Sequence, residues 1–143
     1  MNLNQIKFMK LRIDNLIGDT LMCTPALREF KLQNPQEKLI CRVKPGSNSY
    51  WMLKDNPYLD ELEISEVNDP NIFLMDAGSA FQEAVKHTKS LTWGFGKILG
   101  VEITDTKYDL VLSPTIQEYR ASFMELAQLM LLPIQVSRHC SLL

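Results

Sequence analysis

An acidic residue follows a glycine at the point where the first predicted strand gives way to the first predicted helix. Gly18 and Asp19 lie in the stretch RIDNLIGDTLMCTPALREF, residues 12–30. A carboxylate at a helix amino terminus is favoured by the helix dipole and can accept backbone N–H bonds, so Asp19 could be an N-cap. The same carboxylate could face a cleft and take a proton from an acceptor hydroxyl, because its two oxygens allow both roles.

Phosphate binding is not what this turn indicates. Neither GxGxxG nor GxxxxGK[ST] is present in the chain. An acidic side chain at the start of a helix would also repel a phosphate group. The residue types therefore favour a proton-accepting or a capping role for Asp19.

Strands that alternate with helices account for most of the chain. Residues 6–13 mix apolar and basic residues and predict a first strand that is covered on both sides for most of its length. Apolar residues at helical spacing predict a helix from Asp19 to about Asn34, with either a kink at Pro25 or a regular part that starts there. Gly94 and Gly96 are expected to weaken or split a later helix. Further strands are predicted at 38–43, at the end of YLDELEI, and at 72–76, 108–113 and 133–138, and further helices at about 48–53, 79–99 and 115–131. This alternation predicts an α/β parallel sheet with helices on both faces.

A longer pattern surrounds the Gly-Asp pair. An apolar strand leads into Arg-x-Asp-x-x-Gly-Asp, and an apolar stretch, Thr-Pro-Ala-Leu-Arg and a further Pro follow. The residues that form this pattern are Arg12, Asp14, Gly18, Asp19, Thr24, Pro25, Ala26, Leu27, Arg28 and Pro35. The pattern resembles the amino-terminal signature of glycosyltransferase family nine, the heptosyltransferase family, and NPYLDELEI is similar to that family's entry into its third strand.

The resemblance implies a fold and a domain division. The family has two Rossmann-like domains in the GT-B arrangement. Residues 1–132 would then form the amino-terminal, Rossmann-like, acceptor-side domain. Residues 133–143 would hold the first strand of a truncated carboxyl-terminal, donor-binding domain. On this interpretation the chain is the amino-terminal half of a GT-B glycosyltransferase, and we expect it to be an inactive fragment by itself.

The resemblance also implies an activity. Family members transfer a sugar, with inversion, from a nucleotide-diphosphate sugar such as ADP-heptose to a saccharide or lipopolysaccharide-core acceptor. They use the Asp of the Gly-Asp pair as the general base, which makes Asp19 the predicted catalytic residue. Gly18, Thr20 and Thr24 are the predicted substrate-binding residues. The nucleotide sugar is a co-substrate, and no cofactor is expected.

Ser137 and Arg138 lie at the end of the last predicted strand. The family places hydroxyl residues and a nearby Lys in the corresponding loop, against the donor diphosphate. No Lys follows here before residue 143, so Arg138 would have to supply the positive charge. We therefore assign Ser137 and Arg138 to donor binding on the resemblance alone.

Composition and charge exclude several other classes. The net charge is −2, with a pI near 5.7, so no overall basic field favours nucleic acid. No run is apolar enough for a signal peptide or a membrane span, which predicts a cytoplasmic protein that meets the inner face of the cytoplasmic membrane only peripherally. Cys23, Cys41 and Cys140 are far apart and predict reduced thiols. His87 and His139 lack metal-ligand spacing, so no metal site is expected.

Two alternatives to the glycosyltransferase interpretation stay open. A stand-alone α/β binding module could keep this fold without catalysis. A phosphoacceptor domain could use Asp76 at the end of a strand, although the acidic cluster that such a domain needs is not evident.

Overall fold

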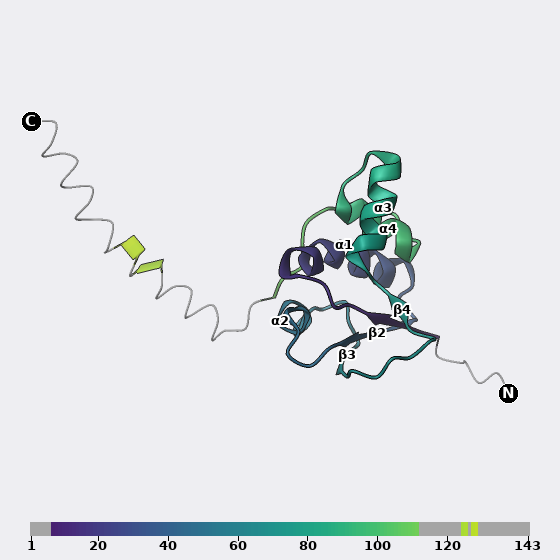
Figure 1. Cartoon of the computed structure of the whole chain (residues 1–143), viewed down its shortest axis with the longest axis horizontal. Coiled ribbons are helices and arrows are strands. Elements are labelled where there is room, and N and C mark those ends of the chain that lie inside the picture. The colour runs from purple at the N-terminus through teal and green to yellow at the C-terminus, as the bar shows by residue number, and fades with distance from the viewer. Residues whose placement is uncertain (1–6, 112–123, 126, 129–143) are drawn as a thin grey trace, which may run out of the picture. The chain divides into compact units, whose positions relative to one another are not determined.

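The computed structural model describes residues 7–111 and residues 124, 125, 127 and 128 (Figure 1). Residues 7–111 belong to the unit Met1–Val111, which is separate from the unit Leu112–Leu143. The sheet and its helices all lie in the first of these units.

This unit contains a four-stranded, all-parallel sheet in the order β3-β2-β1-β4. The elements are β1 Phe8–Arg12, α1 Ile17–Gln33, β2 Lys38–Val43, α2 Asn48–Leu53, β3 Glu61–Ile64, β4 Phe73–Leu74, α3 Ala77–His87 and α4 Leu91–Leu99. β1 is central, and Leu11 pairs with Cys41 on one side and with Phe73 on the other. The order and the parallel pairing are those of a Rossmann-like α/β fold, which confirms the predicted fold class.

One face of the sheet forms the core. Alternate strand residues Leu11, Leu39 and Cys41 are fully buried, and they belong to one apolar cluster with Leu27 of α1 and Phe95 of α4. Figure 1 shows α1, α3 and α4 on the same side of the sheet. α1, α3 and α4 thus cover one face of the sheet (Figure 1), whereas the sequence predicted helices on both faces without assigning individual helices to a face.

The opposite face of the sheet carries paired charges. Lys10 Nζ lies 3.2 Å from Glu63 Oε1, and Arg42 Nη2 lies 2.9 Å from Glu63 Oε2. The strand register places Arg12 beside Arg42, and Arg42 beside Glu63. The mixture of apolar and basic residues in the first strand thus reflects one apolar and one charged face, where the sequence predicted a strand covered on both sides.

The helix α1 begins at Ile17 and continues through Pro25, where the sequence predicted a kink or a later start. Proline has no N–H to donate to the carbonyl of Leu21, four residues earlier. The hydroxyl of Thr24 donates to that carbonyl at 2.8 Å instead. The residue before the proline therefore repairs the gap in the helix.

The long helix predicted over 79–99 is divided, but not at its glycines. α3 ends at His87, and its C-cap Thr88 adopts the left-handed conformation (φ 54°). Ser90 then caps α4 by accepting a bond from the Trp93 N–H. Gly94 serves close packing, because a Cβ there would lie 2.1 Å from the Ala80 carbonyl oxygen of α3. The two helices pack through this contact.

Later predictions have mixed outcomes. Residues 108–111 do not form a strand, contrary to the strand predicted over 108–113. Met124, Glu125, Ala127 and Gln128 are helical, as expected within 115–131. The rest of that helix, the strand at 133–138 and the proposed donor domain 133–143 lie outside the described residues.

Replacing Gly94 by Ala should destabilise the first unit, because backbone atoms of α3 occupy the space that the new methyl group needs. We expect a loss of about 1–3 kcal/mol in the free energy of unfolding, measured by urea denaturation. Gly18→Ala is the matched control: a methyl group on this helical glycine would meet nothing within 4 Å, so stability should stay equal or rise by about 0.5–1 kcal/mol. Equal stabilities of the two variants would contradict the packing role of Gly94.

Candidate functional site

Asp19 lies at the carboxyl end of the central strand, in the first turn of α1. It is the third residue of the helix, and the N-cap is Leu16, whose side chain makes no capping bond. The predicted N-cap role of Asp19 is therefore wrong, because the helix begins two residues earlier. The side chain is half-buried, and within residues 7–111 its carboxylate has neither a hydrogen-bond nor an ion-pair partner. A carboxylate in this state is available to a ligand.

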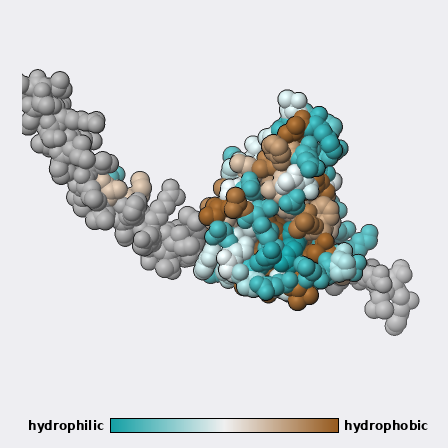
Figure 2. Space-filling model, in the orientation of Figure 1, coloured by the Kyte–Doolittle hydropathy of each residue, from teal (hydrophilic) through white to brown (hydrophobic). Residues whose placement is uncertain are grey.

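Gly18 leaves open space beside Asp19. It is exposed, its φ is not positive, and a Cβ would meet nothing within 4 Å. The backbone therefore does not require glycine here. The neighbouring Leu16 and Ile17 are also exposed, and Figure 2 shows apolar groups of this kind between polar ones on the surface of this unit.

Arg12 and Asp14 hold the start of the turn. The Arg12 side chain is buried, and its Nε donates to Asp14 Oδ2 at 2.7 Å. Its other two nitrogens donate to the carbonyls of Ser65 and Val67, in the connection from β3 to β4. Asp14 Oδ1 accepts the N–H of Lys44, just after β2, at 2.7 Å. Arg12 thus pairs with Asp14 and leaves Asp19 without this partner.

Asn15 holds the other side of the turn and was missed by the sequence reasoning. Its Nδ2 donates to the Met75 carbonyl at 2.8 Å, and its Oδ1 accepts the Ala77 N–H at 3.2 Å. The turn is therefore tied to the end of β4 as well as to β2. A lone Asn between a strand and a helix is the only local signal for this role, and it is shared with many ordinary turns.

The two predicted substrate-binding threonines are fully buried. Thr20 Oγ1 lies 2.9 Å from Ser49 Oγ of α2, and both hydroxyls contact the Asn15 carbonyl. Thr24 bonds the Leu21 carbonyl and accepts a bond from the segment after α4. Neither hydroxyl is exposed to a ligand. In this structure both threonines therefore have a structural role in place of the predicted substrate-binding role.

Three candidate residues named from the sequence remain: Asp76, just before α3, and Ser137 and Arg138. Ser137 and Arg138 lie outside the described residues. Asp76 caps α3 by accepting bonds from Ser79, and these bonds lower its pKa. This capping occupies one oxygen of the carboxylate that a phosphoacceptor domain would use.

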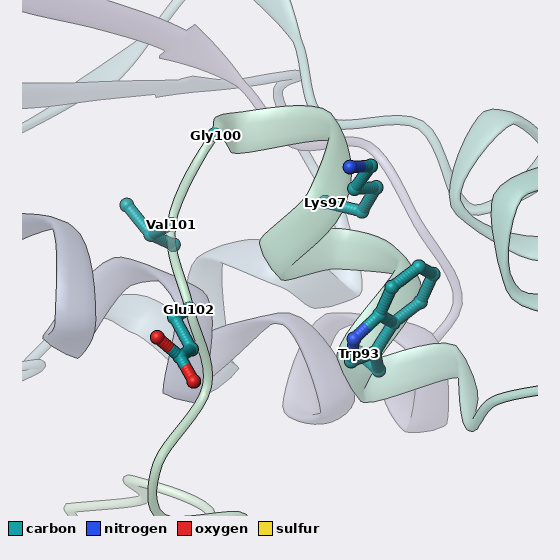
Figure 3. Close-up of a pocket in the computed structure, with 5 residues that line it drawn as sticks. All are labelled: Trp93, Lys97, Gly100, Val101 and Glu102. Atoms are coloured by element: carbon teal, nitrogen blue, oxygen red, sulfur yellow. The ribbon is translucent and has the colours of Figure 1, made fainter.

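A pocket of about 430 Å³ lies at the carboxyl end of α4 (Figure 3). It is lined by Trp93, Lys97, Gly100, Val101 and Glu102, and it shares no residue with the Gly18 and Asp19 turn. Within the described residues no group of His, Cys, Asp and Glu side chains is arranged to hold a metal ion. Among the same residues, none of the helices is both long and apolar enough to cross a membrane.

Comparisons with known proteins do not assign a function to this site. No family model, curated protein or solved structure matches the chain. The site is therefore defined by the contacts of its own residues.

The two aspartates of the turn should differ in their effect on stability. Asp14→Ala removes the acceptor of the buried Arg12 Nε and of the Lys44 N–H, which should cost about 1–3 kcal/mol. Asp19→Ala removes only a favourable charge near the helix start, which should cost less than about 1 kcal/mol. Thermal unfolding of the two variants measures this difference. A larger loss for Asp19→Ala would show that its carboxylate has a structural partner.

The buried thiols should be inert in the folded protein. Burial raises the pKa of Cys23 to about 12, the nearby charge of Asp19 adds to the rise, and burial likewise raises the pKa of Cys41. A thiolate nucleophile at Cys23 is thereby excluded near neutral pH. In a Cys140→Ser variant, a thiol reagent at pH 8 should react only after denaturant is added. Rapid reaction without denaturant would contradict this placement of both thiols.

Proposed function

We propose that this chain is the acceptor-side domain of a sugar-transferring enzyme of the heptosyltransferase kind, with Asp19 as its general base. The observation that carries the proposal is the half-buried Asp19 carboxylate, which lies at the carboxyl end of the central strand and has no partner within residues 7–111. In open α/β sheets, ligands bind outside the carboxyl ends of the strands. A free carboxylate at that place can accept a proton from a bound hydroxyl.

The proposed reaction is a single displacement. The acceptor hydroxyl oxygen attacks the anomeric carbon of the donor sugar while Asp19 takes the hydroxyl proton. The bond from the anomeric carbon to the diphosphate oxygen breaks, and the nucleoside diphosphate leaves with the bonding electrons. Attack from the face opposite to the leaving group inverts the anomeric centre.

The neighbours of Asp19 support this role by fixing the turn. The bonds of Arg12, Asp14 and Asn15 tie it to the connection that follows β3, to the end of β2 and to the end of β4. A base held in one place costs less entropy when the transition state forms. Gly18 adds open space through which a substrate can approach the helix start.

The substrates and the location follow from the same proposal. The donor is a nucleotide-diphosphate sugar such as ADP-heptose, and the acceptor is a saccharide or the lipopolysaccharide core. The reaction takes place in the cytoplasm, at the inner face of the cytoplasmic membrane. Ser137 and Arg138 are the proposed contacts of the donor diphosphate.

Asp19→Asn in the protein expressed from the complete gene should nearly abolish transfer. Asn keeps the size of the side chain but cannot take the hydroxyl proton, so kcat should fall by roughly 10²–10⁴-fold, with KM changed only a few-fold. The assay follows sugar transfer from ADP-heptose to a core oligosaccharide. Asp55→Asn, at an exposed position after α2, is the matched control and should leave kcat unchanged.

Two results would sink this proposal. One is a rate within a few-fold of wild type for Asp19→Asn, and the other is a wild-type protein that transfers no sugar. Saturable binding of the core oligosaccharide without any transfer would favour the binding-module alternative. Nuclear magnetic resonance shifts of the Gly18 and Asp19 amides during a titration with the oligosaccharide separate binding at this turn from binding elsewhere.

A further inference from the structure

The segment that follows α4 is held almost entirely by side chains of α1. The Val101 N–H closes the end of α4 by donating to the Gly96 carbonyl. From residue 102 to residue 111, the described structure contains no further bond between backbone groups. This segment contains no strand or helix, and most of its residues are exposed. Something other than secondary structure must therefore fix its path.

Arg28 makes the largest contribution to this fixation. The residue is only 7% exposed, although its side chain carries a permanent charge. Its guanidinium donates to the carbonyls of Asp105 and Lys107, the latter at 2.8 Å, and to Asp109 Oδ2 at 2.5 Å. The buried charge and three acceptors of one short segment satisfy each other.

Glu29 and Thr24 extend the contact along the helix. Glu29 Oε1 accepts the hydroxyl of Thr104 at 3.0 Å, and Thr24 Oγ1 accepts the N–H of Asp109 at 2.9 Å. The segment therefore runs antiparallel to α1, from Glu29 back to Thr24. It leads toward the amino-terminal end of the helix, where Asp19 lies.

The Thr-Pro pair explains why Thr24 can accept this bond. A hydroxyl has one proton, and Pro25 leaves the Leu21 carbonyl without its usual helical donor. Thr24 donates its proton to that carbonyl, so a lone pair is left for the Asp109 N–H. The proline thus fixes the direction of the hydroxyl and prepares it as an acceptor.

We infer that Thr24, Arg28 and Glu29 form a clamp that fixes residues 104–109 on α1 and so sets where the chain leaves its first unit. The clamp does not depend on the proposed sugar transfer. It gives a role to Thr24 and Pro25, which are fully buried, and to Arg28, which is only 7% exposed. None of the three has the surface that a ligand would need. The clamp thereby fixes the position of the chain near Val111, the last residue of the unit.

Hydrogen exchange measured by mass spectrometry on the whole chain tests the clamp. Arg28→Met keeps the length and apolar part of the side chain but removes the donors, and Thr24→Val keeps the shape but removes the hydroxyl. Each variant should make the Asp109 amide, whose N–H is bonded to Thr24 Oγ1, exchange roughly ten to a hundred times faster, while the amides of β1 and β2 stay protected. Thr24→Ser, which keeps the hydroxyl, should restore slow exchange.

Arg42→Met is the matched control, because this arginine is paired on the charged face of the sheet and makes no contact with residues 104–109. It should leave exchange of the segment unchanged. Asp109→Ala loosens the clamp from the side of the segment and is used if a helix variant does not fold. Unchanged exchange of the residue 109 amide in a folded Thr24→Val or Asp109→Ala protein would overturn the inference.

Discussion

The buried guanidinium of Arg12 is the constraint on which the candidate site depends. A guanidinium keeps its charge in a protein interior, so it must find acceptors where it lies. Asp14 and the carbonyls of Ser65 and Val67 supply them, and these groups come from two connections that are far apart in the sequence. Meeting this requirement fixes the path of the chain after β1. The helix start that carries Gly18 and Asp19 is fixed as a consequence.

The long sequence pattern that includes the Gly-Asp pair divides into two kinds of residue. Arg12, Asp14, Thr24 and Arg28 have their polar groups engaged inside the unit. Asp19, in contrast, keeps a carboxylate free within residues 7–111. A catalytic group needs this combination, because a free side chain is useful only on a turn that does not move. Most of the pattern is therefore engaged in holding the fold, and Asp19 is the member whose carboxylate stays free within residues 7–111.

Local signals decided what the sequence could predict. β1 and β2 were predicted because short apolar-rich stretches mark strands directly. The start of α1 was missed because its N-cap, Leu16, has no polar side chain. The contacts of residues 108–111 and the burial of Thr20 and Thr24 depend on partners far away in the chain, which no local pattern reveals. The free carboxylate of Asp19 is also a property of the folded neighbourhood.

The most direct test of this account is a crystal structure of the protein with the proposed acceptor saccharide bound. The account predicts that the reacting hydroxyl lies about 2.6–3.2 Å from a carboxylate oxygen of Asp19. It also predicts that the Arg12 and Asn15 bonds stay in place around the turn. A saccharide bound away from this turn, or an Asp19 carboxylate that turns to the amides of its own helix in the complex, would contradict it.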